Sequence, residues 1–373
     1  MKILRSLTSV IIGLVFVFSG VVKAIDPLGF AYKIHDYFHA FNLGFLNSLS
    51  LGLAIFMCTA EFVSGFSLLT GLRKKTGLVG VTILLAIFTP LTFVLALTNP
   101  VSDCGCFGDA IHLTNWQTFG KNIFLVFLLI IILSGRDQIR SLFSKTTEWI
   151  IIAISIVLFV AFSLVNLRYL PVIDFLPYKT GVKIAEKMVI PVGVPADEYR
   201  TTFIYEKNGV NKEFNLNNYP ANDSTWKFVD QKSVLVKRGY KPPIHDFAIT
   251  LPGGEDLTQE ILKYNGYTVL MISKKLGEAG KKQLSDGFHM GNYCRTNGIN
   301  FFIITSSGTE EIKSYENGLT FCTADETTLK TMIRANPGYI LLKDGTIFGK
   351  WSWANVPEEE WFGNKVKIIM DKR

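Results

Sequence analysis

Charged side chains are scarce in this chain. Asp, Glu, Lys and Arg make up 18% of its 373 residues, whereas apolar residues make up 49%. The mean hydropathy of +0.29 is high for a water-soluble protein of this length. The apolar excess is concentrated in the first 168 residues. These features exclude a wholly water-soluble protein and indicate a domain that lies in a lipid bilayer.

Five apolar stretches in this first part are candidates to cross a bilayer, whose hydrocarbon core needs about 20 helical residues. In lipid the backbone must satisfy its own hydrogen bonds, so each stretch is predicted to be a helix. The alternative for the first stretch is a cleaved signal peptide, but Lys23 interrupts the small-residue cleavage pattern and further apolar stretches follow it. The predicted spans cover residues 7–22, 49–69, 78–97, 119–133 and 149–167.

Basic residues cluster in alternate loops between these spans, which predicts the topology. The positive-inside rule places the N-terminus in the cytoplasm, and it places both the loop at 99–114 and everything after about Arg168 outside. We therefore expect a multi-pass protein of the bacterial cytoplasmic (inner) membrane with a periplasmic C-terminal part. The same cations explain the net charge of +7, so this charge does not indicate a nucleic-acid partner. They are Lys2, Arg5, Arg73, Lys74, Lys75, Arg136, Arg140 and Lys145.

Cysteine is also scarce, yet two of the five cysteines flank a single glycine in the outward loop NPVSDCGCFGDAIH (99–112). Outside the cytoplasmic membrane a disulfide between Cys104 and Cys106 can persist. Gly105 allows the backbone to bend enough to bring the two Cα atoms into bonding range. Strained, exposed disulfides tend to be catalytic or labile, so the sequence favours a redox pair. The alternatives are a clip that holds the turn and two incidental loop thiols.

A metal site in this loop is the weaker hypothesis. A structural site needs about four ligands, and the loop offers few besides the cysteines: Asp103, Asp109 and His112. The remaining histidines show no ligand spacing, so no metal is predicted.

Two polar residues within the spans are further candidates. Glu61 lies in the second span, three residues after Cys58. An intramembrane carboxyl usually faces a bundle interior or a polar cavity, where Glu61 is either a proton relay, part of a quinone pocket, or a neutral packing residue. Lys121 either lowers the pKa of a nearby cysteine or extends to the membrane interface. The aromatic-rich segment 27–46 is predicted to lie on the outer membrane surface.

Several segments of residues 1–135 resemble MauE, the membrane component of methylamine utilisation, which belongs to a broader DoxX-like group. They are FSGVVKAIDPLGFAYKI (18–34), the span that carries Glu61, DCGCFGD (103–109) and NWQTFGKN (115–122). The resemblance implies a helical bundle that presents a Cys-x-Cys loop outward, with Cys104 and Cys106 as the family's pair. In that family the protein is thought to support the maturation of a disulfide-rich periplasmic dehydrogenase subunit. This chain departs from the family by about 200 additional C-terminal residues.

The composition changes after Arg168. Residues 169–240 contain strand-like segments separated by turn signals, and they are predicted to form a connecting region. From residue 241 helical and strand patterns alternate, and Asp344-Gly345 is typical of a hairpin turn. Residues 241–373 resemble the thioredoxin fold of membrane-anchored TlpA-like proteins, with Pro337 at the position of that fold's cis-proline. The expected fold class is a transmembrane α-helical bundle (1–168) followed by an extracytoplasmic α/β thioredoxin-like domain.

This thioredoxin-like part lacks the redox pair. The cysteines of a thioredoxin would follow the strand GYTVLMIS (266–273), where this chain has KKLGEAGKKQ. Since exchange needs a thiolate and a resolving thiol, the domain is not predicted to be an oxidoreductase by the usual route. The resemblance to thioredoxin-like domains without this pair implies binding rather than turnover. Cys294 and Cys322 are either buried thiols or a structural disulfide, and the odd total of five leaves at least one cysteine unpaired.

Two functions follow from these patterns. In the first, the protein is a thiol–disulfide oxidoreductase or its accessory, in which Cys104 and Cys106 accept electrons from exported cysteine-containing proteins and pass them to a membrane quinone. In the second, it is a non-catalytic, membrane-anchored scaffold or assembly factor with a binding-only C-terminal domain. A transporter is less favoured because Glu61 is the main ionisable group within the spans.

Overall fold

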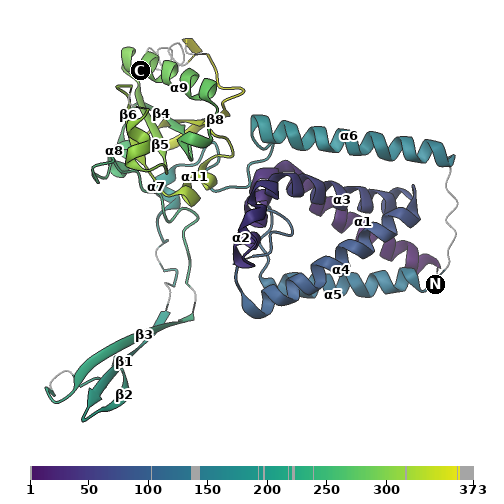
Figure 1. The fold of residues 1–373 in the computed structure, drawn as a ribbon, viewed down its shortest axis with the longest axis horizontal. Helices are drawn as coiled ribbons and strands as arrows, with labels where there is room; N and C mark the ends of the chain where they lie inside the picture. Colours follow the sequence, from purple (N-terminus) through teal and green to yellow (C-terminus); the bar gives the residue numbers. More distant parts are fainter. Residues whose placement is uncertain are drawn as a thin grey trace.

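The computed structural model describes residues 2–101, 103–135, 143–191, 193–195, 198–216, 218–220, 223–237, 239–315, 317–358 and 360–361. Arg136 and Arg140, two of the basic residues that predict the topology, lie outside the described residues, as does the end of the chain at 362–373. A helical bundle and an α/β domain form the two main bodies, and a small sheet projects away from both (Figure 1).

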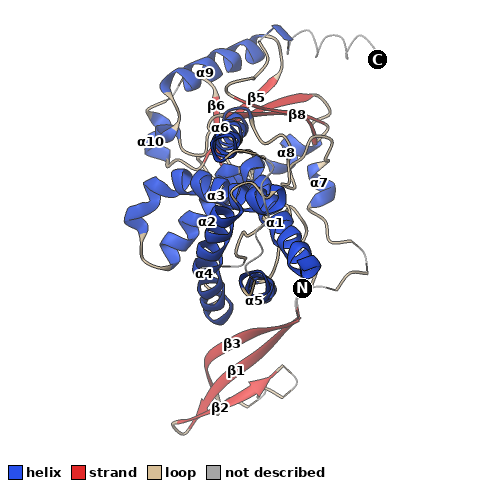
Figure 2. Cartoon of the chain, turned by 90° about the vertical axis from the view of Figure 1, so that its right-hand side faces the viewer, coloured by secondary structure: helices blue, strands red, loops and turns tan. Residues whose placement is uncertain are grey.

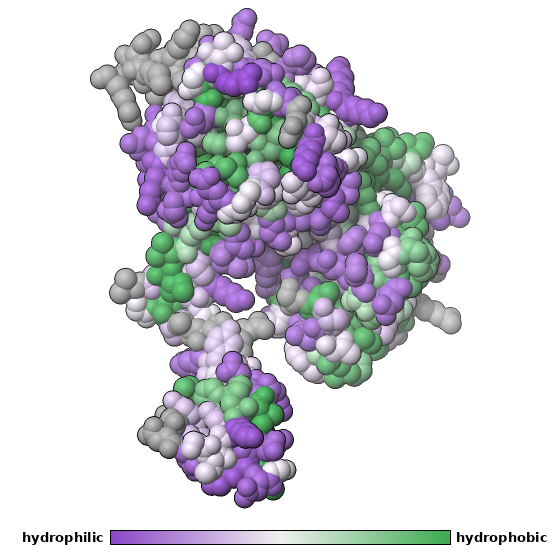
Figure 3. Space-filling view, turned by 60° about the vertical axis from the view of Figure 1, so that its left-hand side comes forward, coloured by the Kyte–Doolittle hydropathy of each residue, from purple (hydrophilic) through white to green (hydrophobic). Residues whose placement is uncertain are grey.

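Five of the described helices are long and apolar enough to cross a membrane, which confirms the predicted spans. They are longer than the apolar stretches because flanking polar residues complete their end turns. Figure 3 shows apolar residues over the outer surface of the bundle, as expected for lipid contact, and mostly polar residues over the α/β domain. The helices are α1 (Lys2–Ile25), α3 (Ser50–Thr70), α4 (Lys74–Thr98), α5 (Asn115–Leu133) and α6 (Lys145–Tyr169).

Glycines allow α1 and α3 to pack closely. A Cβ atom added at Gly65 of α3 would lie 2.7 Å from the carbonyl oxygen of Gly13 on α1. One at Gly20 would lie 2.8 Å from the carbonyl oxygen of Cys58. Small residues at such crossings bring helix backbones together in membranes, where dispersion contacts rather than the hydrophobic effect hold helices to each other. This pair of helices is therefore the closely packed centre of the bundle.

The helix α2 (Pro27–Ala40) follows α1 at the end of the bundle nearest the α/β domain (Figure 1), and the short 3-10 helix η1 (Gly44–Leu49) leads from it to α3. Asp26 caps α2 by accepting a hydrogen bond from the backbone N–H of Gly29 at 2.8 Å. The helix buries Phe30 and Ile34 against α3. The first half of the segment 27–46, which is predicted to lie on the membrane surface, therefore packs onto the bundle.

The C-terminal domain is built on a five-stranded sheet of order β6-β5-β4-β7-β8. Strands β4, β5 and β6 are parallel, and β7 and β8 add antiparallel to β4. This is the strand arrangement of a thioredoxin-like fold, and Figure 2 shows the sheet covered by helices. The strands are β4 (Tyr267–Ile272), β5 (Asn300–Thr305), β6 (Thr320–Thr323), β7 (Gly338–Lys343) and β8 (Thr346–Ser352), and the helices are α8 (Thr258–Lys263), α9 (Lys281–Thr296), α10 (Thr309–Lys313) and α11 (Glu326–Met332).

The two faces of this sheet have separate hydrophobic cores. Helices α9 and α10 cover one core, and α8 and α11 cover the other. Cys294 belongs to the first core and Cys322 to the second, so the two side chains lie on opposite faces and do not form the disulfide considered above. Tyr178 and Ile184, which the sequence placed in the connecting region, are buried in the second core.

A three-stranded antiparallel sheet of order β2-β1-β3 occupies most of the predicted connecting region. Its strands are β1 (Glu198–Lys207), β2 (Val210–Asn215) and β3 (Lys227–Lys237), and the one-turn helix α7 (Ile184–Lys187) precedes them. The sheet extends away from the bundle and from the α/β domain (Figures 1 and 2).

Candidate functional site

The Cys-Gly-Cys loop is held between two well-defined helix ends. Helix α4 is followed by its C-cap residue Asn99, whose φ of 47° is left-handed. Helix α5 is preceded by its N-cap residue Thr114, whose side chain forms a capping box with Gln117. Within the loop, the backbone N–H of Gly105 donates to Oδ1 of Asp103 at 2.9 Å. The φ of +64° at Gly105 strongly favours glycine, which explains the residue between the cysteines.

The two cysteines have different proton affinities. The Sγ atoms of Cys104 and Cys106 lie 2.8 Å apart and share a hydrogen bond. As acceptor in this bond, and with the positive charges of Lys121 and Lys23 nearby, Cys106 has its pKa lowered to about 6 despite burial. The pKa of Cys104 is raised well above its usual range, because it is the donor to Cys106 and is buried. At neutral pH the pair therefore holds one thiolate, on Cys106, and one thiol, on Cys104.

Helix α2 covers the loop from outside the bundle. The hydroxyl of Tyr37 donates to the carbonyl oxygen of Cys104. Lys33 forms an ion pair of 2.8 Å with Asp103. The alkyl chain of Lys33 also lies over Gly105, where a Cβ atom would be 3.0 Å from Cγ of the lysine. Cys104 is consequently buried, whereas Cys106 is partly exposed.

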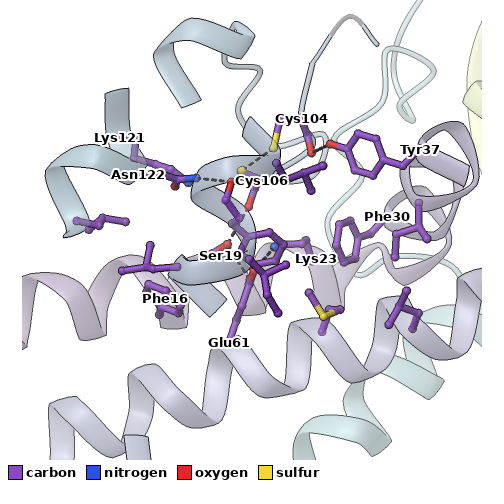
Figure 4. A pocket seen from close by; sticks show the side chains of 18 of the residues that line it. Phe16, Ser19, Lys23, Phe30, Tyr37, Glu61, Cys104, Cys106, Lys121 and Asn122 are labelled. Atoms are coloured by element: carbon purple, nitrogen blue, oxygen red, sulfur yellow. Dashed lines mark hydrogen bonds and ion pairs between the residues drawn. The ribbon is translucent and has the colours of Figure 1, made fainter. Parts of the chain in front are cut away.

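Behind the loop lies a cavity of about 230 Å³, enclosed by α1, α2, α3, α4 and α5. Both cysteines line it, together with mostly apolar side chains such as Phe16 and Phe30. Figure 4 shows the cysteines on one side of this cavity and Glu61 on the other. The cavity therefore connects the two cysteine side chains with the interior of the membrane domain.

A buried ion pair marks the inner end of this cavity. Nζ of Lys23 lies 2.6 Å from Oε1 of Glu61, and both side chains are almost fully buried. The hydroxyl oxygen of Ser19 lies 2.8 Å both from Oε2 of Glu61 and from the carbonyl oxygen of Cys106. Since a hydroxyl has one proton, Ser19 can donate to only one of them at a time. These three side chains form a polar connection from α1 and α3 to the loop.

The structure brings four of the candidate residues together: Cys104, Cys106, Glu61 and Lys121 all line the same cavity. Nζ of Lys121 also lies 4.7 Å from the centre of the Phe107 ring. Pro337 lies in the C-terminal domain, away from the cavity, and its bond to Asn336 is cis. Among the described residues, no group of three or more His, Cys, Asp or Glu side chains is arranged to hold a metal ion.

Sequence reasoning missed Lys23 and Ser19 as members of the site. In the sequence, Lys23 was used only as evidence against a cleaved signal peptide, although its position also indicates a role in the site. A lysine at the end of one apolar span and a glutamate within the next are a pair of opposite charges that each need a partner in lipid. Ser19 carried no such signal, because serine is common in membrane helices.

The thioredoxin-like domain contacts the outer end of this site. Arg334 forms ion pairs of 2.7 Å with Asp26 and 2.6 Å with Asp109, which follows the Cys-Gly-Cys sequence. Lys274 follows β4, where a thioredoxin would carry its cysteines, and its Nζ donates to the hydroxyl of Tyr32 on α2 at 2.6 Å. The edge that would be the active site in a thioredoxin is therefore docked on the helix that covers Cys104.

Comparisons with known proteins agree with this architecture. The family model of the methylamine utilisation protein MauE matches residues 1–135. A model described as a domain of unknown function (DUF8463) matches residues 199–238, the projecting sheet.

Individual relatives match smaller parts of the chain. Protein TlpB of Flavobacterium psychrophilum is 28% identical over 124 residues, which cover 32% of this chain and 34% of that protein. The match thus spans about a third of the length of this curated relative. The solution structure of a proposed protein disulfide isomerase from Bacteroides thetaiotaomicron is 18% identical, with a TM-score of 0.26, covering 34% of this chain and 84% of that one. Residues 1–135 are thus similar to the MauE family, and they are followed by a domain with the strand arrangement of a thioredoxin-like fold.

Proposed function

We propose that this protein is a membrane-bound thiol–disulfide redox protein that uses Cys104 and Cys106 to oxidise the thiols of exported proteins. The observation that carries the proposal is the pairing of two sulfur atoms 2.8 Å apart with opposite shifts of their pKa values. A structural pair would need no such asymmetry. A redox pair benefits from it, because a sulfur with a low pKa is the better leaving group in exchange.

The reaction consists of two exchanges. A thiolate of the exported protein attacks Sγ of Cys104 in the oxidised loop, the Cys104–Cys106 bond breaks, and Cys106 leaves as the thiolate. A second thiolate of the client then attacks the client sulfur of the mixed disulfide and releases Cys104. The client has gained a disulfide, and the loop has taken up two electrons as a thiol and a thiolate.

The compartment of this reaction is part of the proposal. The loop and the thioredoxin-like domain lie at the same end of the bundle, as the ion pairs of Arg334 with Asp26 and Asp109 require. The basic clusters in the alternate loops support a periplasmic location for this end. A phosphatase reporter fused after Lys145 should be inactive, and one fused after Pro171 should be active. The reverse pattern would put the loop in the reducing cytoplasm and refute the proposal.

The test of the function replaces Cys104 and Cys106 by serine, separately and together, in the producing cell. The redox state of periplasmic proteins is followed by thiol trapping, and the amount of the membrane protein by immunoblotting. We expect normal amounts of each variant and an accumulation of reduced client proteins. A client peptide with a single cysteine should accumulate as a mixed disulfide with Cys104 of the oxidised wild type, because it lacks the second thiol that releases Cys104.

A non-catalytic scaffold is the second candidate function. It is favoured by Lys274 and Lys275, which stand where a thioredoxin has its reactive cysteines, and by the docking of this edge on α2. The same experiment separates the two functions. If client oxidation is unchanged while the serine variants remain abundant, the scaffold is the correct function and the redox proposal fails.

A further inference from the structure

We propose that the cavity behind Cys106 binds the ring of a lipid-soluble quinone, which enters from the outer leaflet between α3 and α4 and oxidises the cysteine pair. This inference rests on the proposed function, because the pair must be reoxidised after each client. It adds what that function leaves open, namely the chemical class of the electron acceptor and the place where it binds.

The size of the cavity fits a single substituted ring. An engineered protein cavity of about 150 Å³ holds a benzene molecule, and this cavity measures about 230 Å³. A long isoprenoid tail does not fit into the remaining volume, so the tail must leave through an opening. A soluble acceptor such as a flavin nucleotide is too large and too polar for this space.

The opening faces lipid rather than water. Leu53, Met57 and Glu61 follow one another at four-residue spacing on α3 and all line the cavity, so they form a stripe along its length. Leu53 at one end is 36% exposed, whereas Glu61 at the other end is 3% exposed. Across from them on α4, Ile87 lines the cavity and is 52% exposed. An apolar tail between these helices would lie in the bilayer while the ring reaches the buried end.

The polar groups of the cavity lie where a quinone ring would need them. Lys23 and Ser19 supply hydrogen-bond donors for a carbonyl oxygen at the inner end, the Glu61 carboxylate accepts from both of them, and Lys121 supplies a cation near the loop. The remaining lining is almost entirely apolar, as in sites that bind apolar ligands and orient them with a few polar groups. Cys106 lines the same space, so its sulfur and the ring would be neighbours.

The electrons and protons of this step balance. Cys104 as a thiol, Cys106 as a thiolate, one quinone and one proton give the Cys104–Cys106 disulfide and one hydroquinone. The two sulfurs lose two electrons and form the S–S bond, and the quinone gains these electrons. One proton comes from the Cys104 thiol, and the other comes from the Lys23–Glu61 pair, which recovers it from solvent.

The test uses the reduced full-length protein in lipid nanodiscs with decylubiquinone as the probe. Hydroquinone formation is followed by absorbance, and the state of Cys104 and Cys106 by mass spectrometry after alkylation. Met57→Trp fills the cavity. Leu53→Trp narrows its opening, at a partly exposed position that leaves room for a larger side chain. Phe56→Trp is the matched control on the same helix, because Phe56 is 66% exposed and lies outside the lining.

We expect both cavity variants to reduce decylubiquinone at least 10-fold more slowly than the wild type, and Phe56→Trp to match the wild type. Equal rates in all four proteins would overturn the inference, as would a wild type that does not react with the quinone. Exchange with a reduced client peptide is measured separately, starting from oxidised protein. If this exchange succeeds while quinone reduction fails, only the acceptor is wrong. If it fails while quinone oxidises the pair, the proposed function is wrong and the quinone site remains.

Discussion

Alkylation of Cys106 should follow a pH profile with a midpoint near 6, and Cys104→Ala should move this midpoint upward. The hydrogen bond from Cys104 is the largest cause of the low pKa of Cys106, ahead of the charge of Lys121. Without the thiol donor, burial opposes the remaining charges of Lys121 and Lys23, so the pKa should rise toward the ordinary cysteine value of about 8.5. The expected upward shift of the midpoint is therefore about 2 pH units.

The size of this pKa shift decides whether the alkylation rate at pH 7 or the midpoint of the pH profile is the more useful measurement. At pH 7, a pKa of about 6 leaves roughly 90% of Cys106 as thiolate, and a pKa of about 8.5 leaves roughly 3%, a 30-fold difference. However, thiolate nucleophilicity increases with pKa, with a Brønsted coefficient of about 0.4–0.5. The thiolate of the variant therefore reacts roughly 10–20 times faster than the wild-type thiolate, which offsets most of its lower abundance. The rate at pH 7 should thus fall only about 2- to 3-fold, whereas the midpoint moves clearly.

The assay alkylates the reduced protein in nanodiscs with iodoacetamide between pH 4.5 and 10 and quantifies the Cys106 peptide by mass spectrometry. Cys104→Ser is the matched control, because its hydroxyl can still donate a hydrogen bond, and its midpoint should lie between those of wild type and Cys104→Ala. Lys121→Met should give a smaller increase than Cys104→Ala. A midpoint near 6 in Cys104→Ala would refute the assignment of Cys104 as the donor that stabilises the Cys106 thiolate.

Three further predictions concern the packing that supports the site. Gly65→Ala should lower the stability of the bundle by about 1–3 kcal/mol through overpacking against α1, whereas Gly52→Ala, with open space at its Cβ position, should leave the Tm in detergent unchanged. Arg334→Met removes the partner of two carboxylates and should weaken the docking of the C-terminal domain on α2 by roughly 3–5 kcal/mol. Hydrogen exchange in α2 should therefore become faster, whereas the exposed Lys313→Met should leave it unchanged. Equal exchange in both variants would contradict the role of Arg334. Burial and the charges of Arg334 and Lys330 lower the pKa of Lys274 to about 7. Above this pH the unfolded chain binds more protons at Lys274 than the folded chain does, so stability increases with pH. The Tm should therefore rise between pH 7 and 9 in wild type, and it should rise less in Lys274→Met.

Much of the architecture could be predicted because it depends on local patterns. Apolar runs of sufficient length specify the membrane helices independently of how these helices pack. The hairpin between β7 and β8 could be predicted from Asp344-Gly345, whose φ values of 49° and 66° are those that a tight turn requires. The inclusion of Tyr178 and Ile184 in the C-terminal core was not predictable, because it joins segments that are far apart in the chain.

The candidate site was only partly predictable for the same reason. Cys104 and Cys106 are neighbours in sequence, so their pairing needed no tertiary information. Glu61 was recognised as an unusual residue, but its partner Lys23 depends on the rotation of α1 relative to α3. Two apolar helices can bury an ionisable side chain in many orientations, and only the packing at Gly13 and Gly65 selects this one.

By itself, the sequence determined that the chain has five membrane-spanning helices, an adjacent pair of cysteines in a polar loop, and a thioredoxin-like domain without the usual cysteines. These features follow from hydrophobicity, spacing and turn chemistry along the chain. The tertiary structure alone decided that Cys106 rather than Cys104 is the thiolate, that both line a cavity with Glu61, and that Arg334 docks the second domain on α2. The physical reason is that proton affinity, cavities and ion pairs depend on distances between residues from different helices, which local sequence patterns do not specify.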